Sequence, residues 1–177
     1  MAICPKCGSW VDEGDVCRNC GGVPGYRNEG YGSSSRYGQE VFSSKAWDAY
    51  HNHQYDLALY YIDTALLRNV LYAENWNKKA IILEAKGDFE ESKKCYDEAL
   101  SLERSNVYID NKAYMMKNWA IKLYEEKKDL KKAIDLLKEA ISDISSIDSE
   151  EDVEEYKKLL KTIQEKYRRR KLRFGYE

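Results

Sequence analysis

The sequence predicts an all-α body of stacked helix pairs, preceded by a small cysteine-rich segment. Only 2 of the 177 residues are Pro, and Ala, Leu, Lys and Glu recur, which favours helices over sheet. Similar stretches recur at an interval of 34 residues in the centre of the chain. With 43% hydrophobic residues, the chain has enough apolar surface for one ordinary core and a small appendage.

The cysteine-rich segment, residues 1–22, has the spacing of a metal site. Two residues separate the cysteines of each of two pairs, and nine residues separate the pairs. Two such turns supply the four sulfur ligands that tetrahedral Zn²⁺ prefers. Trp10 and Val11 precede the polar DEGD, which predicts a short hairpin with its turn near Gly14. The predicted zinc ligands are Cys4, Cys7, Cys17 and Cys20.

Zinc bound by four thiolates is structural, because no coordination position stays open for water. The alternatives are a pair of disulfides, which reducing conditions in the cytosol disfavour, or four thiols with no special role. The knuckles CPKCG and CRNCG resemble those of short zinc ribbons over residues 3–22. Such ribbons occur in proteins that bind nucleic acid or other proteins, so the resemblance implies one structural Zn²⁺ and leaves the function open.

Residues 23–39 are predicted to be a flexible linker, since Gly, Ser, Tyr and Arg dominate there without periodicity. A second interpretation is that Tyr26, Tyr31 and Tyr37 stack on bases while Arg27 and Arg36 contact phosphate. The simple spacer is the interpretation that the composition favours.

The body, residues 40–148, is predicted to hold three helix pairs. In the second helix of each of the first two units, Tyr55, Ala58, Ile62 and Ala65 correspond to Phe89, Ser92, Tyr96 and Ala99. These residues fall on one helix face, and the small ones allow a neighbouring helix to approach closely. The preceding helix contributes Phe42, Ala46 and Ala49 in the first unit, and Trp76, Ala80 and Leu83 in the second.

The second unit resembles the tetratricopeptide repeat, whose signature is W-x2-L-G-x2-Y followed by A-x3-F and a further Ala. The matching residues are Trp76, Ala80, Leu83, Gly87, Phe89, Tyr96 and Ala99. A third unit uses Ala120, Leu123, Leu130, Ala133, Leu137 and Ala140 in the corresponding roles. About six extra residues precede it, which predicts a longer first helix that begins near Asn106 and projects beyond the stack.

Residues 149–177 predict a C-terminal capping helix with a basic tail. An apolar stripe runs along one face of this helix, as expected for a helix that covers the open end of a repeat stack. The stripe consists of Val153, Tyr156, Leu160, Ile163 and Tyr167.

The family resemblance implies a concave groove, lined by the first helix of each pair, that binds a peptide or a partner helix. Projecting the pattern places Trp47, Tyr50, Asn77, Lys78, Ile81, Lys117, Asn118 and Tyr124 in the groove, with Ser43 and Ile121 beside them. Some family members hold a peptide's terminal carboxylate between Lys and Asn side chains, but Ser43 and Trp47 stand where those residues are expected, so this clamp is incomplete. Packing against the neighbouring repeat is the alternative role of Trp47.

The basic tail supports an alternative function, that of a factor associated with nucleic acid or ribonucleoprotein. Such a cluster neutralises several phosphates, and the zinc ribbon would add a second contact. Because the net charge is −2, the rest of the chain is acidic. The candidate contacts are Arg168, Arg169, Arg170, Lys171 and Arg173.

Other features argue against an enzyme and a membrane protein. The sequence has no Gly-rich phosphate loop, nucleophile elbow or zinc-protease helix. It also has no apolar run of bilayer length and no leader sequence, so a cytoplasmic protein is expected. His51 and His53 are expected to be surface polar residues rather than metal ligands, and Cys95 to be a small apolar residue of the core or of an interface. The prediction is therefore a non-enzymatic adaptor with a protein or peptide partner.

Overall fold

The computed structural model describes the backbone of residues 2–3, 10–11, 34–126, 128–147 and 150–174, and the side chains of residues 38–126, 128–147 and 153–173. Within these ranges, helices account for nearly all of the regular structure. They are α1 (Ser34–His51), α2 (Tyr55–Arg68), α3 (Ala73–Lys86), α4 (Phe89–Leu102), α5 (Asn106–Glu125), α6 (Leu130–Ser145) and α7 (Glu150–Phe174).

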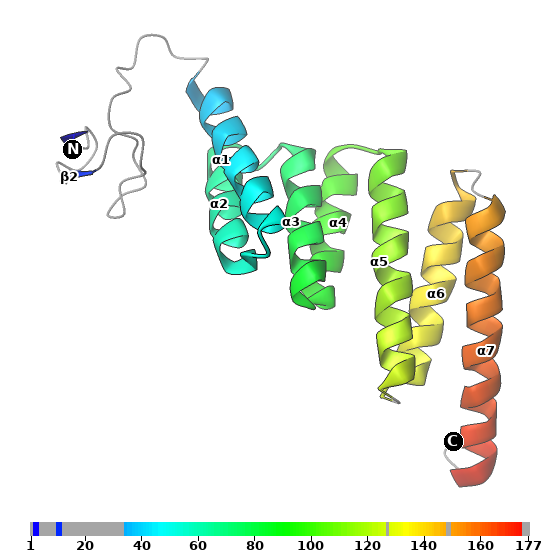
Figure 1. Ribbon diagram of the computed structural model, residues 1–177. Coiled ribbons are helices and arrows are strands. Elements are labelled where there is room, and N and C mark those ends of the chain that lie inside the picture. The colour runs from blue at the N-terminus through cyan, green and yellow to red at the C-terminus, as the bar shows by residue number, and fades with distance from the viewer. Residues whose placement is uncertain (1, 4–9, 12–33, 127, 148–149, 175–177) are drawn as a thin grey trace.

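The helices form a row of antiparallel pairs (Figure 1). Helix α1 packs against α2, α3 against α4, and α5 against α6, while α7 lies against α6 at the end of the row. The predicted all-α stack of three helix pairs with a terminal helix is therefore confirmed.

The small residues of the repeat lie where the helices pack most closely. Ala58, Ala65, Ala80 and Ala99 have no exposed surface, and Tyr96 beside them is also buried. Ser92 takes the place of Ala58 in the second unit, and its hydroxyl donates to the Ala80 carbonyl oxygen at 2.8 Å. This bond satisfies a buried hydroxyl that would otherwise cost free energy. The predicted apolar faces of the repeats are thus the core.

Two equivalent turns close the first and second pairs with left-handed residues. Gly87 has φ 90° and follows α3, and His53, at the equivalent position after α1, has φ 57°. The next residue of each turn donates its backbone N–H back to the preceding helix at 2.9 Å, Gln54 to the Ala49 carbonyl and Asp88 to the Leu83 carbonyl. Glycine adopts this conformation without cost, whereas a residue with a Cβ does not.

Helix α1 begins at Ser34, so the last six residues of the segment predicted as linker are helical. Packing on α2 accounts for this extension. Gln39 and Phe42 are buried, and the Arg68 guanidinium lies 4.8 Å from the centre of the Phe42 ring. Gly38 approaches the same arginine so closely that a Cβ there would lie 2.9 Å from Arg68 Nη1. These contacts offset the low helix propensity of the Gly/Ser-rich sequence.

Helix α5 begins at Asn106, as predicted, and has 20 residues against 14 in α3. Its first turns are in register with α3, because Asn111 bonds to Asn77 and Asn118 bonds to Glu84. The additional residues therefore carry the far end of α5 beyond the end of α3 (Figure 1).

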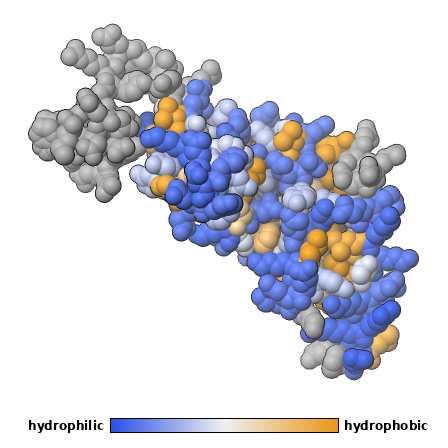
Figure 2. Space-filling view, in the orientation of Figure 1, coloured by the Kyte–Doolittle hydropathy of each residue, from blue (hydrophilic) through white to orange (hydrophobic). Residues whose placement is uncertain are grey.

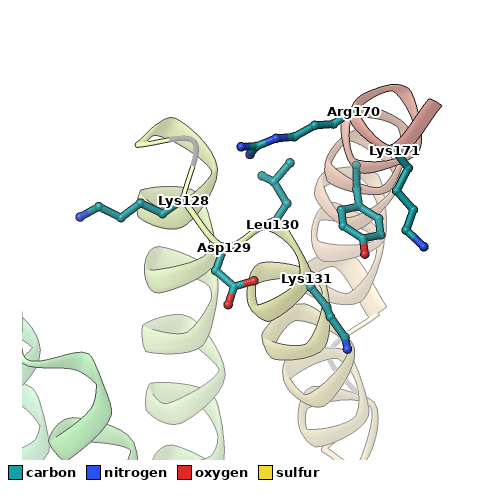
Figure 3. A pocket seen from close by; sticks show the side chains of 7 residues that line it. Lys128, Asp129, Leu130, Lys131, Arg170 and Lys171 are labelled. Carbon is teal, nitrogen blue, oxygen red and sulfur yellow. The ribbon is translucent and has the colours of Figure 1, made fainter. Parts of the chain in front are cut away.

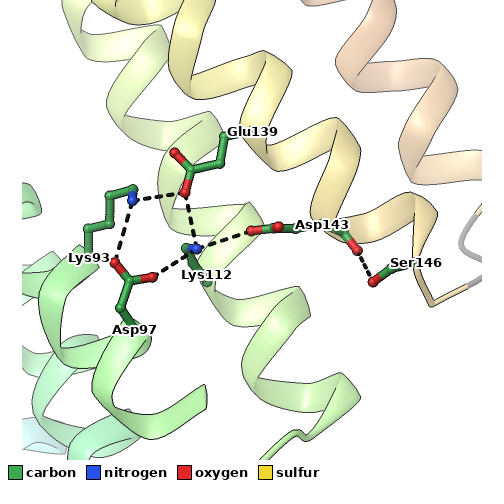
Figure 4. A network of polar contacts seen from close by, with 6 residues as sticks. All are labelled: Lys93, Asp97, Lys112, Glu139, Asp143 and Ser146. Carbon is green, nitrogen blue, oxygen red and sulfur yellow. Dashed lines mark hydrogen bonds and ion pairs between the residues drawn. The ribbon is translucent and has the colours of Figure 1, made fainter. Parts of the chain in front are cut away.

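A network of charged side chains joins α4, α5 and α6 (Figure 4). The buried Lys112 ammonium lies 2.9 Å from Asp97, 3.1 Å from Glu139 and 3.2 Å from Asp143, and Lys93 lies 2.8 Å from Glu139. Burial opposes the charge of Lys112, but its three carboxylate partners outweigh this effect and raise its pKa. For Glu139 burial also disfavours the charged form and by itself would raise the pKa, but the ammonium groups of Lys93 and Lys112 outweigh this effect and lower the pKa below its ordinary value. The network thus fixes the third helix pair against the second.

The N-terminal segment contains two short strands, β1 (Ala2–Ile3) and β2 (Trp10–Val11), which pair antiparallel with Ile3 opposite Trp10. The connection between them holds the first cysteine pair. The four predicted zinc ligands, the predicted turn near Gly14 and the tyrosines and arginines of residues 23–33 lie outside the described residues.

Candidate functional site

Side chains of α1, α3, α5 and α7 contact one another along one side of the stack, here called the first-helix face. Four polar contacts run from one helix to the next along this face. They join Lys78 Nζ to Ser43 Oγ at 3.0 Å, Asn111 Nδ2 to Asn77 Oδ1 at 3.1 Å, Asn118 Nδ2 to Glu84 Oε1 at 2.9 Å, and Lys117 Nζ to Glu155 Oε1 at 3.3 Å. Helix α7 therefore stands beside α5 as α5 stands beside α3.

The face contains four residues predicted to line a groove, Asn77, Lys78, Lys117 and Asn118. A fifth, Tyr50, follows Ser43 by seven residues in α1 and therefore lies on the same side of that helix. In Figure 2, viewed from the side of α1, α3 and α5, the surface is mostly hydrophilic, with separate apolar spots. A partner on this face would therefore meet polar groups interrupted by aromatic and aliphatic ones.

Both lysines of the face already have acidic partners. Lys78 lies 2.7 Å from Glu74, and this ammonium lowers the pKa of Glu74, as does the hydroxyl of Tyr72, against the opposing effect of burial. Lys117 pairs with Glu155 and lies 5.0 Å from the centre of the Tyr156 ring. These pairs satisfy the cations that would otherwise hold a terminal carboxylate. The carboxylate clamp, already incomplete in the sequence, therefore has both of these lysines occupied by acidic side chains.

Glu84 occupies the middle of the face and was not among the predicted residues. Burial raises the pKa of its carboxyl group, and the hydrogen bond from Asn118 opposes this increase only in part. Sequence reasoning also missed Asn111, although the 34-residue interval that separates it from Asn77 was the signal that would have found it. The same interval separates Glu84 from the predicted Asn118, so it would have found Glu84 as well.

Trp47 belongs to an aromatic cluster at the end of α1. Its ring stacks on Tyr50 with centroids 4.9 Å apart, and His51 meets it edge-on at 5.1 Å. Tyr50 also lies 6.1 Å from Tyr55 at the start of α2. Burial, followed by the influence of Tyr55 and Glu84, raises the pKa of the Tyr50 phenol. Trp47 is half-buried, and these ring contacts lie within its own helix rather than across to the next repeat.

Two other predicted groove residues pack against neighbouring helices. Ile81 is half-buried against the main core. Tyr124, at the far end of α5, lies beneath Lys166 of α7, whose ammonium is 3.8 Å from the ring centre. Tyr124 is therefore part of the junction between α5 and α7.

The basic end of α7 forms one wall of a pocket of about 440 Å³ (Figure 3). The opposite wall comes from the turn between α5 and α6 and from the first residues of α6. Lining residues are Lys128, Asp129, Leu130, Lys131, Tyr167, Arg170 and Lys171. Two of the predicted nucleic-acid contacts, Arg170 and Lys171, thus line the pocket, while Arg168, Arg169 and Arg173 are exposed on α7 outside its lining.

The remaining candidates have simple surroundings. His51 bonds to the Trp47 carbonyl oxygen and His53 to the Tyr55 hydroxyl, both at exposed positions. Cys95 is buried, which raises the pKa of its thiol to about 11. Over the residues that the structure describes, no three His, Cys, Asp or Glu side chains gather closely enough to hold a metal ion. None of the described helices has the length and apolar character needed to cross a membrane.

Comparisons with known proteins identify the repeat and the fold. Residues 73–106 match the model of the tetratricopeptide repeat. The N-terminal domain of stress-induced protein-1 (STI-1) from C. elegans superposes with a TM-score of 0.55 at 16% identity, covering 75% of this chain and 98% of that one. The Arabidopsis OM64 TPR domain gives 0.54 at 14% identity, covering 73% and 98%.

A third similar structure is the Yersinia enterocolitica type III secretion chaperone SycD in complex with a peptide of the translocator YopD. Its TM-score is 0.50 at 15% identity, covering 78% of this chain and 97% of that one. No curated protein matches the sequence. The chain therefore contains a tetratricopeptide repeat within a tetratricopeptide-like stack of helix pairs.

Proposed function

We propose that this chain is a non-enzymatic scaffold that binds a segment of another protein along the first-helix face. The observation that carries the proposal is the continuous row of side-chain contacts from α1 to α7, which joins predicted binding residues of three repeats on one surface. The SycD structure, which has a similar fold, holds a peptide of YopD. An adaptor of this kind would bind its partner through the first-helix face and make a second contact through another part of the chain.

The chemistry of the face indicates which segment would bind. Asn77 is buried, but the half-buried Asn118 and Tyr50 offer amide and hydroxyl groups to the backbone of an extended peptide, and Trp47 offers aromatic surface for an apolar side chain. Lys78 and Lys117 are engaged by Glu74 and Glu155. We therefore expect an internal peptide segment rather than a chain ending in a free carboxylate.

The test is selection of binding peptides from a displayed library of random linear peptides on the full-length protein, followed by affinity measurement. We expect micromolar affinity, equivalent to about 8 kcal/mol. Trp47→Ala with Lys117→Ala should weaken the selected peptides about tenfold or more, because both side chains lie on the proposed surface. The matched control is Tyr60→Ala with Lys94→Ala, since these exposed side chains lie on the second helices α2 and α4.

Equal loss of affinity in both double variants, or unchanged affinity in Trp47→Ala with Lys117→Ala, would place the binding surface elsewhere. Circular dichroism melting of each variant separates a binding defect from loss of the fold. Selected peptides that require a free C-terminus would contradict the expectation of an internal segment.

The second module of the proposal is a zinc ribbon formed by Cys4, Cys7, Cys17 and Cys20. Support comes from the cysteine spacing and from the pairing of Ile3 with Trp10, which brings together the residues on either side of the first cysteine pair. When bound, Zn²⁺ would supply most of the folding free energy of so short a segment. The ribbon would serve as an additional contact for the partner.

Elemental analysis of the purified protein should find one zinc ion per chain. Cys17→Ser with Cys20→Ser should lose the metal, because two thiolates bind it far more weakly than four. Cys95→Ala should retain it, since Cys95 lies in the helical core. A full zinc content in the first variant would rule out the proposed ligand set.

A further inference from the structure

The pocket at the end of the stack is built from two parts of the chain that are far apart in sequence. Lys128 and Lys131 come from the α5–α6 turn and the start of α6, and Arg170 and Lys171 come from the last turns of α7. In Figure 3 the side chain of Arg170 extends across the opening toward the turn that holds Lys128. Four cationic residues therefore line one hollow, and Asp129 is the single acid in its lining.

The acid in the lining has a role in the helix. Asp129 caps α6, with its Oδ1 accepting a hydrogen bond from the Lys132 backbone N–H at 2.9 Å, as is common for Asp at a helix N-terminus. Lys128 Nζ lies 2.6 Å from Glu126, but both side chains are exposed, so solvent screens this pair. The pocket thus keeps an excess of positive charge close to the positive end of the α6 dipole.

The floor of the pocket is apolar and aromatic. Leu130 and Tyr167 are the apolar and aromatic residues of its lining, and the Lys171 ammonium is 6.0 Å from the centre of the Tyr167 ring. A site for a bare phosphate group needs cations and amide donors but no aromatic surface. A volume of about 440 Å³ is in the range of small-molecule sites, and a ring beside cations is the arrangement that holds a base and its phosphate in single-strand binders.

Positive charge continues beyond the pocket along α7. Residues 161–173 contain seven Lys or Arg and one Glu, and Arg168, Arg169 and Arg173 are exposed. One phosphorylated side chain would use only a few of these cations. A ligand with several regularly spaced phosphates would reach more of them, although the basic residues spread around the helix.

From these observations we infer that the pocket binds one nucleotide of a single-stranded nucleic acid, with its base against Tyr167 and its phosphate among Lys128, Lys131, Arg170 and Lys171. The adjoining phosphates would follow the basic surface of α7. A double helix keeps its bases stacked inside, so it would reach the outer cations but not the floor of the pocket. This site is separate from the proposed peptide surface and involves different residues.

The experiment is fluorescence anisotropy of the full-length, zinc-loaded protein with labelled oligouridine RNA of about 12 nucleotides, across a salt series. If about four phosphates are contacted, log K should fall with log salt with a slope of about −3. Lys128→Gln with Lys131→Gln should weaken binding about tenfold and reduce the steepness of the slope by up to about 0.7, the value for one lost phosphate contact on a single strand.

The matched control is Lys138→Gln with Lys158→Gln, which removes the same charge from exposed positions of α6 and α7 outside the pocket lining. Its effect should stay within about twofold if the pocket is the site. An equal loss of affinity in the two double variants would mean binding by diffuse charge and would overturn the proposal. Absence of binding at low salt would do the same.

Tyr167 distinguishes a nucleotide from other polyanions. Tyr167→Leu should weaken RNA binding about tenfold, the loss expected when one base stacks on one ring, and Tyr167→Phe should retain binding because the ring remains. Melting curves exclude partial unfolding of α7, and tripolyphosphate binding should be the same in wild type and Tyr167→Leu. Unchanged RNA affinity in a folded Tyr167→Leu variant, or equal affinity for a duplex of the same length, would refute a base in the pocket.

Discussion

Replacing Lys112 with Met tests whether the charged network between α4, α5 and α6 fixes the third repeat in place. The ammonium group is within 3.2 Å of three carboxylates, and its side chain is only 9% exposed. Methionine keeps a similar unbranched shape and removes the charge. The substitution would leave Asp97, Glu139 and Asp143 close together with only Lys93 to oppose their repulsion.

The expected cost follows from the burial of the network. Breaking a buried ion pair by removing one partner costs about 3–5 kcal/mol. The three carboxylates are 28–48% exposed, so water and salt screen part of the repulsion that remains. We therefore expect the lower end of the range, about 3 kcal/mol, and a fall in Tm of about 10 °C for a body of this size.

The assay is urea unfolding of wild type and variant, followed by far-UV circular dichroism, with Lys158→Met as the control. Lys158 is exposed on α7, and its replacement should change the unfolding free energy by less than about 0.5 kcal/mol. Adding Asp143→Asn to Lys112→Met should recover part of the loss, because one of the uncompensated charges disappears. A cost below about 1 kcal/mol for Lys112→Met, with no recovery in the double variant, would refute the assigned role of the network.

Three further predictions concern the turns, the terminal helix and acid stability. Gly87 and His53 both have left-handed backbone conformations, which only Gly adopts freely. Gly87→Ala should therefore lower the free energy of unfolding by about 1–2 kcal/mol, and His53→Gly should raise it by about 0.5–1 kcal/mol. A less stable His53→Gly variant would contradict this account. Ile163→Ala should cost about 3 kcal/mol and speed hydrogen exchange in α7, since Ile163 is fully buried, whereas exposed Leu172→Ala should have little effect. Folding lowers the pKa of Glu139, so its contribution to stability should be present above the carboxyl pKa of the unfolded chain and decline as the pH falls through the pKa of the folded state. The unfolding free energies of wild type and Glu139→Gln, measured in urea, should therefore converge in acid. A constant difference at all pH values would disprove this dependence of stability on Glu139 ionisation.

Much of the fold could be read from local patterns. The 34-residue interval, the small residues at Ala58, Ala80 and Ala99, and the apolar stripe of α7 each record which side of a helix faces its neighbour. These features depend on residues within a few turns of one another, and they led to the correct helix pairs and the start of α5 at Asn106. The start of α1 was misjudged, because the composition of residues 34–39 indicates a linker and only packing against α2 shows why they are helical.

The candidate site was predictable only in part. Asn77, Lys117 and Asn118 were expected on one surface because repeats place equivalent residues on equivalent faces, and their contacts run along the first-helix face. Repetition does not reveal that Glu84 is partly desolvated at its centre or that Glu155 neutralises Lys117. Those facts depend on the distance between successive helices and on the position that α7 takes beside α5.

The amino-acid sequence by itself therefore determined the helix pairs, their order and the cysteine spacing that predicts zinc, since each of these is a short-range pattern. Only the tertiary structure decided which charges meet. Lys112 finds its three carboxylates on α4 and α6, and Lys131 and Arg170 line the same pocket, because the length of α5 and the path of α7 set where the ends of distant helices come together. Electrostatic contacts depend on these distances rather than on periodicity, so they appear only once the chain is folded.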